Sequence, residues 1–156
     1  MRTLTTNVDI KEVSPDQVFK WFLSLTNKKY TEWHPAHKKW RWRIKHKNEI
    51  EVGDKLIFRE KVGKFDIRFT GKLTKIEENT YMQFKHKYLP VCISFLFKQT
   101  EVGTRVNFES KIGYKKFGSF IDFWLRKIYP EPKFSHAIIN HVHEEFELLE
   151  HIFKQD

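Results

Sequence analysis

The stretch KFSHAIINHVHEEFELLEHIFK, residues 133–154, has the regular apolar spacing of one long helix. At 3.6 residues per turn its apolar side chains fall on a single stripe, formed by Phe134, Ile138, Val142, Phe146, Leu149, Ile152 and Phe153. A stripe of this kind needs a partner surface that buries it. The stretch therefore predicts a long C-terminal helix that packs across whatever the rest of the chain builds.

Two charged residues of this helix do not lie on its polar face. Glu145 falls inside the apolar stripe, and His141 lies at the edge of the stripe one turn earlier, whereas His143 and Glu144 project to other faces. A buried carboxylate is costly unless it is paired or bound to a cation. His141 and Glu145 stand side by side at i and i+4, so they could hold one metal ion. The alternatives are a simple His–Glu hydrogen bond or a Glu145 that reaches water at the boundary of the core.

Upstream of the helix, apolar and polar residues alternate in the manner of β-strands. We expect a first strand over 2–10 and six later strands near 39–45, 55–62, 65–76, 80–88, 91–97 and 102–112. Ser14 and Pro15 are typical of a helix start, and a second short helix or a turn is expected within 26–36, ending at Pro35. A very apolar helix is expected over 117–128. Repeats and linkers are absent from the sequence, so a single domain over 1–156 is expected.

This order of elements predicts an α+β fold: a curved antiparallel sheet of about seven strands, wrapped around the C-terminal helix, with two short helices after the first strand. The order resembles the START-like or Bet v 1-like (SRPBCC) helix-grip superfamily, which includes polyketide cyclases and lipid-transfer domains. The resemblance covers essentially the whole chain and implies a hydrophobic cavity between the sheet and the last helix. The residues expected to line this cavity are Trp42, Phe58, Phe69, Phe84, Phe95, Ile138 and Val142.

The composition fits a globular protein that binds a small molecule. Hydrophobic residues make up 40% and charged residues 31% of the chain, which excludes an intrinsically disordered protein. The aromatic content of 16% suits a cavity for an aromatic or aliphatic ligand. The single cysteine, Cys92, excludes an intramolecular disulfide. Without an apolar signal segment or a membrane-spanning run, the sequence favours a cytoplasmic location.

The net charge of +9 raises nucleic acid as a possible partner. However, Lys and Arg are spread along the strands as the polar alternates, for example Lys39, Arg41 and Arg43. This distribution favours a solvated basic exterior, and we expect no specific nucleic-acid partner. The sequence also lacks a nucleophile elbow, a P-loop and a dinucleotide-binding fingerprint.

Three further positions could supply polar groups to the cavity. In KLIFREKVG the strand alternation puts Glu60 on the inward face, although a Glu near a strand end could instead point to solvent. In EWHPAHKKWRW, His34 and His37 flank Pro35 near one mouth of the cavity, where they are either ligands or surface residues. His86 lies on an apolar strand face and is either a core histidine or part of a site.

Together these positions offer the inward nitrogens and carboxylates that Zn²⁺ takes. WHPAH, a strand Glu and HVHEE resemble the zinc-dependent hydrolases of the 2,4-diacetylphloroglucinol hydrolase type. The resemblance implies a Zn²⁺ cofactor bound by two His and two Glu, and hydrolysis of a carbon–carbon bond between an acyl group and a phenolic ring. By position, the implied ligands are Glu60, His141, Glu145 and an early histidine, which is His37 or, as the alternative, His34.

Three functions stay open on the sequence, and the third of them is an interaction protein that uses the basic exterior and has a filled core. The first is a zinc-dependent hydrolase of an acylated aromatic or ketone-like molecule, with His86 or Tyr88 as a proton donor. The second is a non-catalytic binder or carrier of a small hydrophobic molecule, in which His141 and Glu145 are a polar anchor. The 117–128 helix, with Phe117, Phe120, Phe123 and Trp124, is expected to be a lid or the face of a homodimer.

Overall fold

The computed structural model describes residues 1–47, 49–114 and 119–155, and the seven strands predicted from the sequence lie within these ranges. The strands are β1 (Arg2–Lys11), β2 (His37–Arg43), β3 (Lys55–Val62), β4 (Phe65–Glu77), β5 (Tyr81–His86), β6 (Val91–Gln99) and β7 (Gly103–Ile112). The helices are α1 (Pro15–Leu23), α2 (Asn27–Trp33), α3 (Ser119–Ile128) and α4 (Lys133–Gln155). The predicted order of elements is therefore confirmed.

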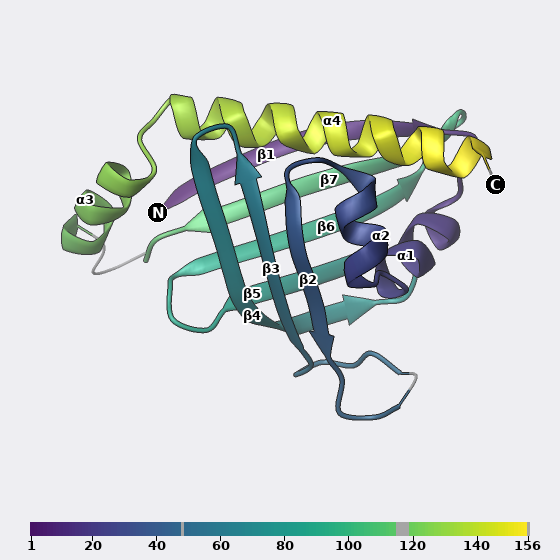
Figure 1. Cartoon of the computed structure of the whole chain (residues 1–156), viewed down its shortest axis with the longest axis horizontal. Helices are drawn as coiled ribbons and strands as arrows, with labels where there is room; N and C mark the ends of the chain where they lie inside the picture. The colour runs from purple at the N-terminus through teal and green to yellow at the C-terminus, as the bar shows by residue number, and fades with distance from the viewer. Residues whose placement is uncertain (48, 115–118, 156) are drawn as a thin grey trace.

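The strands form one curved sheet in the order β1-β7-β6-β5-β4-β3-β2, and each neighbouring pair is antiparallel. Helix α4 runs the length of the molecule along the sheet, and α1 and α2 lie under its C-terminal half (Figure 1). The predicted stripe of α4 is buried from Phe134 to Leu149 and partly buried at Ile152 and Phe153, and the buried set includes both His141 and Glu145. The helix-grip architecture expected from the sequence is thus confirmed.

Local sequence rules fix where the short helices begin and end. Ser14 caps α1, because its hydroxyl accepts the backbone N–H of Gln17 while the Gln17 side chain accepts the N–H of Ser14. Helix α2 ends at Trp33, two residues before Pro35, where the sequence predicts the end of this segment. The reason is Pro35, since the residue before a proline avoids the helical conformation and His34 is indeed extended.

A β-bulge near the start of β2 sets the direction of His37. His37 pairs with Glu60 and Lys39 pairs with Arg59, so Lys38 is an extra residue on this strand. The extra residue shifts the phase of the alternation, and both His37 and Trp40 point into the core although they are three positions apart. Strand β2 therefore begins two residues earlier than predicted, with an inward histidine as its first residue.

Helix α3 occupies Ser119–Ile128 of the apolar segment predicted over 117–128; residue Phe117 lies outside the described residues. It lies at one end of the molecule, beside the N-terminus of the chain (Figure 1). Among the helices in the described part of the chain, none is long and apolar enough to cross a bilayer.

Candidate functional site

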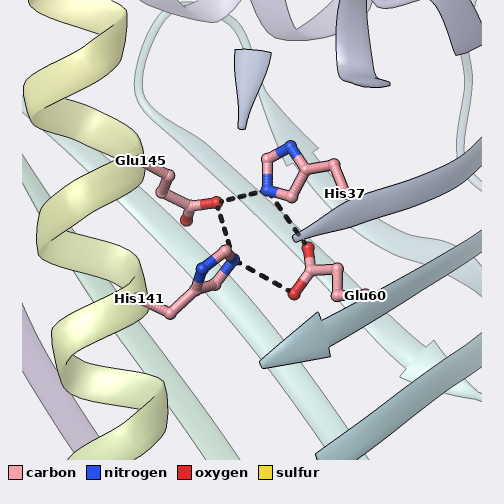
Figure 2. Close-up of side chains that lie close together, drawn as sticks. All are labelled: His37, Glu60, His141 and Glu145. Carbon is pink, nitrogen blue, oxygen red and sulfur yellow. Dashed lines mark hydrogen bonds and ion pairs between the residues drawn. The ribbon is translucent and has the colours of Figure 1, made fainter. Parts of the chain in front are cut away.

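Four side chains from three elements converge against the inner face of the sheet. His37 comes from the start of β2, Glu60 from β3, and His141 and Glu145 from successive turns of α4 (Figure 2). Each residue offers one nitrogen or oxygen atom, and these four atoms lie within 4.8 Å of one another. We call this group the His–Glu quartet. Glu60 faces inward here, as the alternation of β3 predicts.

Four distances between histidine nitrogens and carboxylate oxygens of the quartet are close to those expected around a tetrahedral metal ion. His37 Nε2 lies 3.1 Å from Glu145 Oε2 and 3.7 Å from Glu60 Oε1. His141 Nε2 lies 3.4 Å from Glu60 Oε2 and 3.5 Å from Glu145 Oε2. With zinc–ligand bonds of about 2.0 to 2.1 Å, tetrahedral ligand atoms lie roughly 3.3 Å apart. The donor set and its spacing therefore fit Zn²⁺.

The two histidine rings are oriented for a cation. His37 Nδ1 lies 3.0 Å from the Tyr30 carbonyl oxygen, so it carries a hydrogen and donates it there. His37 Nε2 then faces the carboxylates, which calls for a second ring proton or for a cation between the groups. His141 Nε2 is buried, and within the described residues it makes no hydrogen bond, although two carboxylates lie close to it.

In the metal-free protein, each charged group of the quartet stabilises the charged form of its neighbours of opposite sign. Burial on its own lowers the pKa of His141, but the Glu60 and Glu145 carboxylates outweigh it and raise that pKa to about 9. Burial on its own raises the pKa of Glu60, but His141, His37 and Tyr30 together lower it. An imidazolium at His141 thus partly neutralises the carboxylates, and a bound cation would take over that role.

Two aromatic residues of α2 hold the quartet in place. The Tyr30 hydroxyl donates to Glu60, and the Tyr30 ring stacks on that of His37 with 4.0 Å between the centroids. Burial, followed by the Glu60 charge, raises the pKa of Tyr30, so the hydroxyl keeps its proton. Trp33 Nε1 donates to the backbone carbonyl of Glu145 at 2.6 Å. Neither residue was predicted from the sequence. The sequence feature that could have indicated them is their i, i+3 spacing, which places both on one face of α2.

The structure brings His37, and not His34, to Glu60 and Glu145. His34 Nδ1 accepts the backbone N–H of Ala36 at 2.9 Å, so the ring hydrogen is on Nε2, which lies 3.1 Å from Glu144 Oε2. His34 and Glu144 form a second group with His141. Glu144 is exposed, so this pair lies on the solvent side of the quartet.

A cavity of about 130 Å³ lies between the sheet and α4, and three members of the quartet, Glu60, His141 and Glu145, form part of its wall. Six of the residues predicted to line the cavity do so: Phe58, Phe69, Phe84, Phe95, Ile138 and Val142. Trp42 was also predicted but does not line it. The curled sheet brings the Trp42 ring against those of Trp40 and Phe84, at 6.0 and 5.8 Å between centroids.

His86 and Tyr88, the predicted proton donors, have different surroundings. His86 lines the cavity, but its Nδ1 accepts the backbone N–H groups of Tyr88 and Leu89 at 3.0 Å each, and burial lowers its pKa. The prediction that Tyr88 faces the cavity is wrong. Strand β5 ends at His86, the alternation ends with it, and the Tyr88 side chain is 71% exposed on the following turn.

Comparison with known proteins shows that solved structures share the fold of this chain. No family model and no curated protein matches the chain. Among solved structures, the KanY protein matches with a TM-score of 0.68 and 9% identity, over 98% of this chain and 97% of that one. Ara h 8.0201 matches with a TM-score of 0.64 and 12% identity, over 99% of both chains.

A third solved structure is the Polyketide_cyc-like protein Cgl2372 from Corynebacterium glutamicum. It matches with a TM-score of 0.60 and 19% identity, over 97% of this chain and 91% of that one. At such identities the likeness concerns the backbone. The chain therefore has the helix-grip fold that was expected from its sequence.

Proposed function

We propose that this protein binds a small, mainly apolar molecule in the cavity between the sheet and α4. The observation that carries the proposal is the cavity itself, which is lined mainly by apolar side chains and has a cluster of ionisable side chains, Glu60, His141 and Glu145, in its wall. An engineered apolar cavity of about 150 Å³ in another protein binds benzene. A volume of about 130 Å³ therefore suits a ligand with a single ring or a short branched chain.

We also propose that His37, Glu60, His141 and Glu145 hold a Zn²⁺ ion at the wall of the cavity. The support comes from the 3.1 to 3.7 Å between the histidine nitrogens and the carboxylate oxygens, and from His141 Nε2, which makes no hydrogen bond within the described residues although two carboxylates lie near it. Tyr30 and Trp33 supply the outer hydrogen bonds that such sites use to orient their ligands. When bound, the ion would supply Lewis acidity to a polar group of the cavity ligand.

A second candidate function is metal-dependent hydrolysis of an acylated aromatic or ketone-like molecule. One observation favours it: three of the four donor residues face the cavity, so a ligand carbonyl can lie directly beside the donor atoms. The apolar rings around them would orient an aromatic ligand and limit the access of water. This function requires the ion, whereas ligand binding does not.

The binding proposal is tested with the purified protein and a panel of graded size, from toluene and phenol to naphthalene and a steroid. Single-ring compounds are expected to raise the melting temperature and to shift methyl signals of cavity residues in NMR spectra, and the largest compounds are not. Ile138→Phe fills the cavity and is expected to abolish these effects, while Leu148→Phe on the exposed side of α4 keeps them. Equal binding by Ile138→Phe would contradict the proposal.

The metal proposal is tested by elemental analysis of tag-free protein purified without a chelator. We expect close to one zinc per chain, lost in Glu145→Gln and retained in Glu147→Gln, which changes an exposed carboxylate of the same helix. Hydrolysis of acyl-phenols by the zinc-loaded protein, absent in Glu145→Gln, would support the second function. If no zinc binds even when it is added, the metal site and the hydrolase are both rejected, and the ligand-binding proposal is unaffected.

A further inference from the structure

The exposed apolar side chains of this protein gather at one end. Of the twelve large apolar side chains exposed within the described ranges, eight lie on α3, the chain start, the end of β7 and the β5–β6 turn: Met1, Tyr88, Leu89, Tyr114, Phe120, Phe123, Trp124 and Ile128. Contacts join these segments, since the N-terminal ammonium pairs with Asp122 at 3.3 Å and the N–H of Gly113 donates to the Pro90 carbonyl at 2.8 Å. We call this region the aromatic end.

Helix α3 turns an apolar face away from the protein. Phe120, Phe123, Trp124 and Ile128 follow helical spacing and lie on one face, with between 50% and 71% of each side chain exposed. Leu125 points the other way and is buried. An amphipathic helix whose rings face solvent while its other side packs on the protein indicates a surface that binds a partner.

The charges on this surface are positive. The Lys127 Nζ lies over the rings of Phe123 and Trp124, at 4.6 and 5.2 Å from their centroids. Within the part of the chain that the structure describes, no carboxylate pairs with Arg126 or Lys127. The nearby acids are already paired, Asp122 with the N-terminal ammonium, and Glu131 with Arg2. A second copy would bring like charges together on a chain of net charge +9, whereas an anionic surface complements them.

We propose that the aromatic end docks on the surface of an anionic lipid bilayer. Phe and Trp side chains favour the membrane–water interface, and neighbouring Lys and Arg bind anionic headgroups. The cavity reaches toward the same end, because Leu89 of the aromatic end and Tyr129, which follows α3, are among its lining residues. A docked protein would thus bring this end of the cavity close to the bilayer. The proposal goes beyond ligand binding and does not depend on it.

The test is co-sedimentation of the full chain, without added ligand, with vesicles of phosphatidylglycerol and phosphatidylcholine in equal parts. Wild-type protein is expected to bind these vesicles and to bind pure phosphatidylcholine far more weakly. The double variant Phe123→Ser, Trp124→Ser should lose about tenfold or more in vesicle affinity. The matched control, Val52→Ser with Val102→Ser, changes two exposed apolar residues in other loops and should bind like the wild type.

Two further measurements separate the possible causes. Lys127→Glu reverses one charge and is expected to reduce binding to anionic vesicles several-fold, with an unchanged melting temperature. The fluorescence of Trp124 should shift to the blue on anionic vesicles, and Trp124→Phe should remove that shift. Equal binding to both vesicle types, or wild-type binding by the double variant, would overturn the proposal. So would a dimer in analytical ultracentrifugation that the double variant dissociates, with vesicle binding absent.

Discussion

Helices α3 and α4 follow each other in the chain and are both amphipathic, but they place their apolar faces oppositely. Helix α4 packs its stripe into the core, and it carries the charged pair His141 and Glu145 within that buried stripe. Helix α3 buries Leu125 and leaves Phe123 and Trp124 exposed. Periodicity therefore identifies both helices but does not say which face meets the protein.

The two helices also carry two different features that cost free energy, buried charges on α4 and exposed apolar rings on α3. Buried charges on α4 cost free energy unless they are matched, and the quartet matches them with opposite charges. Exposed rings on α3 leave apolar area in water that burial would stabilise by about 25 cal/mol per Å². The buried charges of α4 are compensated inside the protein, whereas the exposed rings of α3 would be buried only by a partner outside it.

The largest predicted effect tests the apolar faces directly. Phe146→Ala on α4 removes a fully buried ring that packs near Phe22 and Trp33, and we expect it to lower the free energy of unfolding by about 3 to 5 kcal/mol. Phe123→Ala on α3 removes a ring that is more than half exposed, and we expect a change within about 0.5 kcal/mol. Urea denaturation of both variants measures these values. A loss above about 2 kcal/mol for Phe123→Ala would mean that α3 is packed in solution and would remove the contrast.

The next prediction concerns the buried charges of α4, which should make the free energy of unfolding depend on pH. In metal-free protein the folded-state pKa of His141 is about 9, above its ordinary value of 6.5. A raised pKa stabilises the folded state fully below about pH 6.5, and this contribution is lost as the pH rises through about 9. We expect the free energy of unfolding to fall across this window by up to about 3 kcal/mol.

Urea titrations from pH 6 to pH 9.5 in the presence of a chelator measure this dependence. His141→Gln should flatten the profile, while His136→Gln, on the exposed side of the same helix, should leave it unchanged. A profile that keeps its full slope in His141→Gln would assign the titration to another group.

The fold could be predicted because its elements obey local periodicities. The stripe of residues 133–154 predicted α4 to within one residue of its observed end, strand alternation predicted six strands, and the density of Thr and Val predicted the first strand. The end of α2 before Pro35 agrees with the prediction. The error at Tyr88 lies where a period stops, because β5 ends at His86 and leaves Tyr88 on an exposed turn.

The site could be predicted only in part, for a related reason. The inward directions of Glu60, His141 and Glu145 follow from a strand period and a helix period, which the sequence contains. The choice between His37 and His34 depends on the bulge at Lys38, which resets the alternation of β2 and is not visible in the sequence. Counted back from Trp40 without the bulge, His37 would face outward.

The contributions of Tyr30 and Trp33 were missed for a different reason. They depend on how α2 docks against α4 and β3, and this is a contact between distant parts of the chain. Their spacing marks an apolar face on a short helix, but it does not name the carboxylate and the carbonyl that they meet.

The smallest predicted effect tests whether α2 tunes the quartet. Tyr30→Phe keeps the ring that stacks on His37 and removes only the hydroxyl that donates to Glu60. In metal-free protein a lost hydrogen bond to a charged group should lower the free energy of unfolding by about 1.5 kcal/mol. If the quartet binds zinc, losing this outer hydrogen bond should also weaken zinc binding by about tenfold.

Competition with a chromophoric zinc chelator measures the affinity, and urea denaturation measures the stability. The matched control is Tyr129→Phe, which changes another cavity-lining tyrosine, one that packs on Phe134 two turns of α4 before His141. A loss of zinc affinity in Tyr30→Phe alone would show that α2 orients Glu60 for the metal. A loss of stability without a change in affinity would show that the hydroxyl serves the fold only, because the carboxylate would then reach the same position without it.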